Sequence, residues 1–454
     1  MVSAILQSME WFVTLVFGIF VWLPIPIISA QRQGFRRVCY FASWSIHREV
    51  EEARFDIDYI EPDLCTHLIY AFAKIDPTSL TLTPWDETDI NNGVDLPNYN
   101  KFNDIKERNS NLKTLLSVGG HTAGTNQFIQ MVATKKRRVK FILSAIDILR
   151  TYGFNGIDID WEFPRSHDRA QFTELIKEFR EAFEKESKMT KRPRLILTAA
   201  VGVNENQITY SYDVAQISKY LDFFNVMTYD FHGHWQSYLG FNSPLFSRNS
   251  QNRKFSHSLS QEWVINRYIQ AGAPRHKLVL GMAMQGRSFT LANPRATMIG
   301  AKATGPGYAG RMTREKGVMS YFEICELERS GEGSLQWDSV QMCPYFHKGD
   351  FWIGYDNRRS IAIKTAWLVK NKLGGAMVWS IDLDDYQGTF CNEGTYPLIR
   401  TIQRVQFSKS PHTGGELKRG RSNSGAKYNA VDRTINVLIA LVSFVFTQWM
   451  MLRQ

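Results

Sequence analysis

Three carboxylates alternate with apolar residues in one short segment of the chain. Residues 153–164 read GFNGIDIDWEFP, so Asp158, Asp160 and Glu162 are spaced two positions apart. The side chains of a β-strand point alternately to its two faces. If this segment is a strand, the three acids share one face, and the isoleucines and the tryptophan between them share the other.

Acids crowded on one face of a strand favour proton-transfer chemistry. Ionised carboxylates repel one another, so protons are retained and pKa values rise. A glutamic acid that stays protonated near neutral pH is suited to be a general acid, and Glu162 is the last of the three. Asp160 is placed to pass a proton or a hydrogen bond between Glu162 and Asp158. An edge strand with a charged outer face is the alternative, but it does not explain the apolar packing face.

Eight short apolar or β-branched runs are predicted to be strands. Amphipathic stretches such as 126–151 and 169–188 lie between several of them and are predicted to be helices. Strands that alternate with helices form a parallel sheet, and eight such units predict a (β/α)8 TIM barrel, an α/β fold. Glu162 would lie at the C-terminal mouth, where barrel enzymes place their reacting groups. The predicted strands are 36–42, 66–74, 112–118, 155–161, 194–201, 222–228, 277–283 and 374–380.

The alternation of strands and helices is interrupted between residues 286 and 356. This stretch is rich in Gly and aromatic residues and is long enough for a small inserted subdomain. We expect the insertion at about 287–356, within a barrel of residues 31–406. Residues 407–433 are polar, basic and rich in Ser and Gly, which is typical of a linker.

The net charge of +10 on 454 residues does not indicate a nucleic-acid-binding fold. The excess lies in the basic run of residues 135–140 and in the segment 401–433, and the rest of the chain is balanced. We interpret the basic run as a solvated helix face. An apolar content of 44% also excludes a disordered or collagen-like chain. No nucleic-acid partner is expected.

Both ends of the chain carry apolar segments. Residues 1–30 are predicted to be a signal peptide cleaved after Ala30, and an uncleaved N-terminal anchor is the alternative. The hydrophobic segment 434–454 follows a polar spacer and three small residues that begin at Asn423. That order is typical of a GPI signal with attachment at Asn423, and a type I membrane span or a secreted protein are the alternatives. All of them place the folded domain in the secretory pathway, outside the cytosol.

The five cysteines favour disulfides over a metal site. They are Cys39, Cys65, Cys325, Cys343 and Cys391, and none has the C-x-x-C spacing of a zinc ligand pair. In a secreted chain, two disulfides and one free thiol are expected. The residues alone leave the connectivity open.

The D-x-D-x-E segment resembles the family 18 glycoside hydrolases, which comprise chitinases and chitinase-like lectins. The other motifs that carry the resemblance lie in the same order over residues 36–403: CYFASW at 39–44, LLSVGG at 115–120, MTYDFHG at 227–233, NSPL at 242–245, GRSFTL at 286–291, GPG at 305–307, YFEIC at 321–325 and GGAMVWSIDLDDYQG at 374–388.

The resemblance implies several structural features. It implies the barrel, an α+β insertion between strand seven and helix seven, and chitin-type substrates with no cofactor or metal. It also implies the disulfides Cys39–Cys65 and Cys325–Cys391, which leave Cys343 unpaired.

The resemblance also implies a mechanism. Family members retain configuration without a carboxylate nucleophile, because the 2-acetamido oxygen of the substrate attacks the anomeric carbon. Glu162 would be the acid and then the base. Asp160 would hold the acetamido N–H, and Asp158 would support Asp160. Tyr229 would bond the acetamido carbonyl, and Trp379 would form the floor under the distorted sugar.

Further candidates for the substrate cleft come from the matched motifs. An aromatic face suits the C–H side of a pyranose, and hydroxyls take polar partners. These candidates are Tyr40, Trp44, Gly119, Gly120, His121, Met227, Asp230, Trp235, Asn242, Met284, Arg287 and Met377.

The sequence departs from the family pattern at three of its positions. Asn155 stands where the motif usually opens with Asp. His121 stands where chitinases commonly carry a Trp that stacks on a sugar, and Gln285 occupies a usual Tyr position. We expect these changes to affect substrate length and efficiency rather than the type of reaction.

Three functions fit this resemblance. The first is a monomeric, membrane-tethered, endo-acting chitinase. The second is a non-catalytic chitin-oligosaccharide lectin, and the third is a hydrolase of another N-acetylglucosamine glycan, such as hyaluronan or an N-glycan core. Lectin-type relatives usually lose the Glu or the central Asp. Glu162, Asp160, Asp158 and Tyr229 are all present here, which favours the enzyme.

Overall fold

The computed structural model describes residues 34–91, 93, 96–248 and 259–407. The predicted signal peptide, the linker from residue 408 onwards, Asn423 and the hydrophobic C-terminal segment lie outside these residues. Within the described ranges, no helix is long and apolar enough to cross a membrane.

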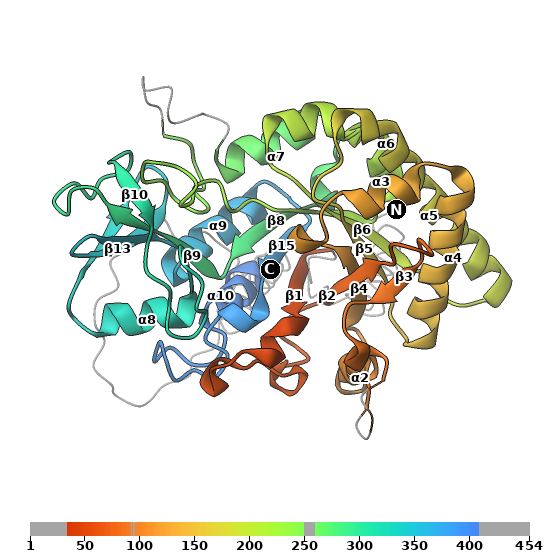
Figure 1. The fold of residues 1–454 in the computed structure, drawn as a ribbon, viewed down its shortest axis with the longest axis horizontal. Helices are drawn as coiled ribbons and strands as arrows, with labels where there is room; N and C mark the ends of the chain where they lie inside the picture. The colour runs from red at the N-terminus through yellow and green to blue at the C-terminus, as the bar shows by residue number, and fades with distance from the viewer. Residues whose placement is uncertain (1–33, 92, 94–95, 249–258, 408–454) are drawn as a thin grey trace, which may run out of the picture. The chain divides into compact units, whose positions relative to one another are not determined.

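Eight parallel strands close into a barrel, which confirms the predicted fold class (Figure 1). The barrel closes because β1 pairs with both the second strand and the last one. A short strand, β3 (Leu82–Pro84), adds to β2 in the antiparallel direction. The barrel strands are β1 (Arg36–Ala42), β2 (His67–Ile75), β4 (Lys113–Gly119), β5 (Gly156–Asp160), β6 (Ile196–Val201), β7 (Phe223–Val226), β8 (Leu278–Ala283) and β15 (Gly375–Trp379).

Helices connect the barrel strands. The single helix predicted over 126–151 is two helices, because Thr134 has an extended backbone and caps the second helix by accepting a hydrogen bond from the Arg137 N–H. The helices are α2 (Asn98–Arg108), α3 (Asn126–Val132), α4 (Lys135–Thr151), α5 (Arg169–Thr190), α6 (Val214–Tyr220), α7 (Gln261–Gln270), α9 (Arg358–Lys370) and α10 (Pro397–Phe407).

In the barrel strands other than β5, alternate residues belong to two separate apolar clusters. Ile157 and Ile159 of β5 pack in the cluster between the strands and the helices. The second cluster fills the barrel interior, with Val38 and Tyr40 from β1 and Met377 from β15. Asp158 and Asp160 of β5 alternate with these isoleucines, so the two acids occupy interior positions, where branched apolar residues are the norm in such barrels.

An antiparallel sheet is inserted between β8 and α9, drawn in teal in Figure 1. It has its own apolar core, which includes Phe241, Phe289 and Trp352. Its elements are β9 (Gln285–Leu291), β10 (Ala303–Pro306), β11 (Val318–Ser320), α8 (Tyr321–Arg329), β12 (Ser334–Asp338), β13 (Cys343–Lys348) and β14 (Phe351–Gly354).

Two disulfides join segments that are distant in the sequence. Cys39 of β1 bonds to Cys65 just before β2, and Cys325 of α8 bonds to Cys391 beyond β15. This is the pairing that the resemblance implied, and Cys343 is a buried free thiol. The first bridge links neighbouring barrel strands, and the second links the insertion to the barrel.

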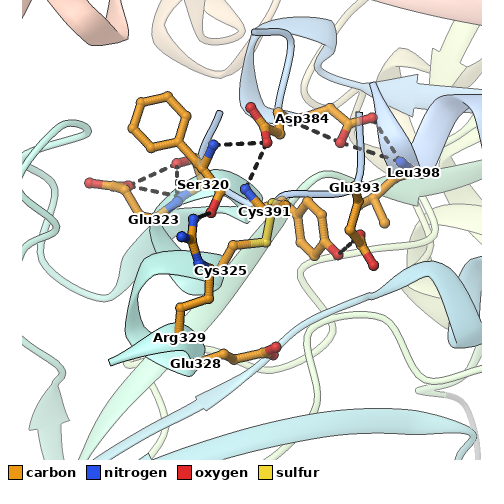
Figure 2. Close-up of a disulfide and its surroundings, with 12 residues drawn as sticks. Ser320, Glu323, Cys325, Glu328, Arg329, Asp384, Cys391, Glu393 and Leu398 are labelled. Atoms are coloured by element: carbon orange, nitrogen blue, oxygen red, sulfur yellow. Dashed lines mark hydrogen bonds between the residues drawn. A yellow bond between two sulfur atoms is a disulfide. The ribbon is translucent and has the colours of Figure 1, made fainter. Parts of the chain in front are cut away.

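The second bridge lies in a hydrogen-bonded junction (Figure 2). The buried Asp384 carboxylate accepts hydrogen bonds from the Leu398 and Ile399 N–H groups at the start of α10. The Arg329 guanidinium at the end of α8 donates to the Phe390 carbonyl at 2.7 Å. The junction therefore holds the insertion, the segment after β15 and the last helix together.

We predict that replacing both Cys325 and Cys391 by Ala lowers the free energy of unfolding by about 2–4 kcal/mol, because the unfolded chain regains the freedom of the loop that the bridge closes. Urea unfolding followed by tryptophan fluorescence measures this change. Cys343→Ala is the matched control, since it removes a buried sulfur but no bridge. Equal losses in the double variant and the control would contradict the prediction.

Candidate active site

The acidic segment forms β5 and its C-terminal exit. Asp158 is fully buried and Asp160 is 3% exposed, while Glu162 follows two residues after Asp160. Trp161 points the other way: its ring stacks on Phe128 of α3 at 5.1 Å between centroids. The strand therefore presents its acids to the interior and its apolar residues to the helices, as the alternation predicted.

The Asp158 carboxylate is bonded to side chains of four other strands. One oxygen accepts from the Tyr40 hydroxyl and from the Ser117 hydroxyl, both at 2.8 Å. The other accepts from the Thr198 hydroxyl at 2.6 Å and the Asn225 amide at 3.1 Å. Burial raises the pKa of Asp158, and these four hydrogen bonds oppose that increase.

Three of these donors were not predicted from the sequence, although the alternation of side chains along the neighbouring strands indicates them. Ser117, Thr198 and Asn225 are polar residues at interior positions of β4, β6 and β7. Ser117 and Thr198 are the direct register partners of Asp158 on its two neighbouring strands. The period-two alternation used for β5, applied to the adjacent strands, predicts them.

Asp160 has a different environment from Asp158. Its Oδ1 atom is buried and has no hydrogen-bond partner among the described residues. Burial raises the pKa of Asp160 well above its ordinary value, and the carboxylates of Glu162 and Asp158 raise it further. The middle acid therefore tends to keep a proton and leaves one buried acceptor for a ligand.

Glu162 lies at the end of the acidic row, with its side chain 16% exposed. Burial raises the pKa of Glu162. The nearby Asp230 also raises it, whereas His121 lowers it. The His121 Nδ1 atom lies 3.7 Å from Glu162 Oε2. A partly exposed acid that holds its proton can deliver it to a bound oxygen atom.

Four aromatic rings lie together beside the acids. Trp379 at the end of β15 has its ring centroid 5.4 Å from that of Tyr40 and 5.9 Å from that of Phe72. Trp44 stacks on Phe72 at 6.0 Å and is 48% exposed. Sequence reasoning missed Phe72, which lies at an apolar position of β2 and carries no polar signal. The rings offer apolar faces of the kind on which sugars stack.

Tyr229 and two methionines line the interior side. Tyr229 is 7% exposed, and its hydroxyl donates to the Met377 sulfur at 3.7 Å. Burial, and next the Asp160 charge, raise the pKa of Tyr229 well above its ordinary value. Met227 packs against the same interior cluster. Tyr229 therefore remains a neutral hydroxyl donor close to the acids.

An ion pair connects the β7 exit to the insertion. The Arg287 Nε–H of β9 donates to Asp230 at 2.7 Å, and the guanidinium lies 5.3 Å from the ring centroid of the exposed Trp235. Asn242 is 1% exposed; its Oδ1 accepts from the Asp230 N–H at 2.9 Å, and its Nδ2 donates to the Gln285 carbonyl at 3.0 Å. Asn242 therefore positions the backbone. Trp235 is exposed, whereas the Arg287 side chain is only 14% exposed.

Of three predicted or unusual positions, two are buried and the third, Asn155, is half-buried. Met284 is 1% exposed and packs in the helix-facing cluster rather than in the barrel interior. Gln285 is 5% exposed, and its Oε1 has no partner within the described part of the chain. Asn155 accepts from the Thr114 N–H at 2.9 Å, so it joins β4 to β5 below the acids.

Two glycines bring the β4 exit against β5. Gly119 and Gly120 have φ values of 114° and 81°, which L side chains rarely adopt. A Cβ at Gly119 would lie 2.1 Å from the Asp160 carbonyl oxygen, and a Cβ at Gly120 would lie 2.5 Å from the Phe72 ring. Glycine is required at both positions because a ring and a backbone approach them closely.

The chain is similar in sequence and in fold to several known proteins. The chain is 39% identical to mouse chitotriosidase-1 over 403 residues, which cover 88% of this chain and 82% of that protein. Two solved structures match its fold: an immunomodulatory active chitinase from Trichuris suis, with a TM-score of 0.78 and 36% identity, and human YKL-39, with a TM-score of 0.77 and 39% identity. Each match covers 82% of this chain, and 99% and 100% of the two solved chains.

These relatives differ in how their activity is described. Human YKL-39 is described as a pseudo-chitinase with retained chitooligosaccharide-binding properties, whereas the Trichuris suis protein is described as an immunomodulatory active chitinase. Residues 36–384 of this chain match the sequence model of "Glycosyl hydrolases family 18". The chain belongs to glycosyl hydrolase family 18.

Proposed function

We propose that this protein is an endo-acting chitinase that hydrolyses β-1,4-linked N-acetylglucosamine chains with retention of configuration. The observation that carries the proposal is the acidic row on β5, in which Asp160 and Glu162 have raised pKa values at the end of the strand. The resemblance to an active chitinase supports it. The alternative is a chitin-oligosaccharide lectin, to which the pseudo-chitinase relative corresponds.

In the first step, the protonated Glu162 carboxyl gives its proton to the glycosidic oxygen, and the bond from that oxygen to C1 breaks. The carbonyl oxygen of the sugar's own 2-acetamido group forms a bond to C1 from the opposite face, which gives an oxazolinium ion. Asp160 accepts the acetamido N–H, which orients the acetamido group for this attack. Its unbonded Oδ1 suits this role.

In the second step, the Glu162 carboxylate takes a proton from a water molecule. The water oxygen bonds to C1 on the face that the leaving sugar vacated, and the oxazolinium ring opens to restore the acetamido group. Two inversions give a β-anomeric product. Tyr229 donates its hydroxyl to the acetamido oxygen, and Trp379 supports the apolar face of the sugar.

We predict that the wild-type chain releases β-anomeric di- and trisaccharides from chitin oligomers, and that Glu162→Gln lowers the rate by at least about a hundredfold, because the amide cannot donate an acidic proton. Chromatography of fresh digests separates the anomers and measures both results. The variant keeps the size of the side chain, so its oligomer affinity and melting temperature serve as controls. Wild-type protein that binds oligomers but never cleaves them would establish the lectin.

We predict that Asp160→Asn stabilises the fold increasingly as the pH rises from the ordinary pKa of 3.8 towards neutrality. The raised pKa means that the folded state resists ionisation of Asp160, so the wild type loses stability over that range, whereas Asn has no charge to bury. Urea unfolding at a series of pH values measures the difference. Asp104→Asn, at an exposed position of α2, controls for the loss of one acid. A constant difference at all pH values would contradict the prediction.

We further propose that the chain is exported and held on the cell surface by a GPI anchor at Asn423, after cleavage behind Ala30. The order of small residues, spacer and apolar tail supports this anchor. The two disulfides are typical of an oxidising compartment.

Phosphatidylinositol-specific phospholipase C is expected to release the protein from intact cells into the medium, because it cleaves the lipid of such an anchor. Immunoblotting of the medium measures the release. A matched variant in which a type I transmembrane helix replaces residues 434–454 stays on the cell and serves as the control. Resistance of the natural chain to the enzyme would contradict the GPI proposal.

A further inference from the structure

His121 lies beside the proposed catalytic acid in place of an aromatic side chain. It begins the short turn His121–Ala123 after β4, and its side chain is 94% exposed. Its Nδ1 atom is 3.7 Å from Glu162 Oε2. In the proposed reaction, Glu162 protonates the oxygen atom that joins two sugars. The His121 side chain, 3.7 Å from Glu162, therefore lies next to the bond that breaks.

The backbone on the N-terminal side of His121 is held against β5. The Gly120 N–H donates to the Asp160 carbonyl at 2.9 Å. The close approach of Gly119 to the same carbonyl leaves no space for a side chain. The position of His121 relative to Glu162 is therefore set by main-chain contacts with the strand that carries the acids.

Trp161, which lies between Asp160 and Glu162 in the sequence, holds the C-terminal side of the same turn. The Trp161 Nε1–H donates to the Thr125 hydroxyl at 2.6 Å, and its ring stacks on Phe128. The turn that carries His121 is thus fastened to β5 at both ends.

Several charged and titratable groups lie near Glu162, and among them burial and the neighbouring carboxylates hold the pKa of Asp160 well above its ordinary value. Asp230 is paired with Arg287, and the two tyrosine hydroxyls are buried and strongly disfavoured from ionising. An imidazole is the side chain whose charge ordinarily changes between pH 5 and 8. The groups are Asp158 and Asp160 on β5, Tyr212 after β6, Tyr229 and Asp230 after β7, Arg287 on β9 and His121 after β4.

We propose that His121 is a positioning residue that controls whether Glu162 holds the catalytic proton. A neutral imidazole leaves Glu162 protonated and able to act as an acid. An imidazolium forms an ion pair with the Glu162 carboxylate, and that pair is inactive as an acid. The catalytic consequence of this proposal rests on the proposed hydrolysis. The pairing of His121 with Glu162 does not depend on it.

Glu162 and His121 can hold a single proton between them in two ways. A protonated Glu162 with neutral His121 and an ionised Glu162 with charged His121 contain the same number of protons, so pH alone does not separate them. A positive charge at position 121 lowers the pKa of Glu162 and so favours the ionised acid. A chain with an uncharged side chain at position 121 therefore retains its acidic form to higher pH.

Two variants test the proposal in opposite directions. His121→Gln is polar but never charged, and His121→Arg carries a permanent positive charge. In the full chain solubilised in detergent, the basic limb of kcat/KM on chitotetraose should move to higher pH in the Gln variant and to lower pH in the Arg variant. At a fixed pH on that limb, we expect a difference from wild type of at least about twofold, a modest factor for an exposed pair. A role limited to sugar stacking would scale kcat/KM equally at every pH.

Carbon-13 NMR separates this inference from the proposed function. The full chain is labelled at the glutamate side-chain carboxyl carbons, and Glu162→Gln assigns the Glu162 signal. Titration midpoints of Glu162 that move up in the Gln variant and down in the Arg variant support the pairing, whether or not the protein hydrolyses chitin. Midpoints that are the same in wild type and both variants would overturn it. Absence of hydrolysis with shifted midpoints would reject the proposed function alone.

Discussion

The Asp158 carboxylate at the centre of the barrel is the interaction on which the rest of the site depends. It accepts four hydrogen bonds from Tyr40, Ser117, Thr198 and Asn225, one from each of four other strands. An acid in the interior of a barrel is costly unless its oxygens are bonded, and here all four bonds come from preformed strands. Side chains from four barrel strands therefore hold the base of the acidic row in place.

The three acids differ because their distance from the barrel mouth differs. Asp158 has its full set of donors, whereas Asp160 has a buried oxygen with no partner in the described structure. Glu162 is partly exposed, and its surroundings include both Asp230 and His121. The row thus contains a fully hydrogen-bonded acid, a buried acid with a raised pKa and a partly exposed acid, in that order along the chain.

Much of this arrangement could be predicted from alternation alone. The period of two assigned the acids of β5 to the interior and Trp161 to the helices, and the spacing of apolar runs predicted the eight strands. Other features depend on backbone geometry that no pattern contains. The break at Thr134 arises from a capping bond, and Asn242 bonds to main chain rather than lining the cleft surface. The distance from His121 to Glu162 arises from how a glycine turn packs on a neighbouring strand.

The bridge between Cys39 and Cys65 has a consequence for how the protein should be produced. Cys39 packs on the helix-facing side of β1, and the next residue, Tyr40, points inward and donates to Asp158. A host compartment that keeps thiols reduced would leave β1 unlinked directly beside this donor. Recombinant protein from an oxidising compartment, such as the periplasm or the endoplasmic reticulum, is therefore the material whose activity represents the folded chain.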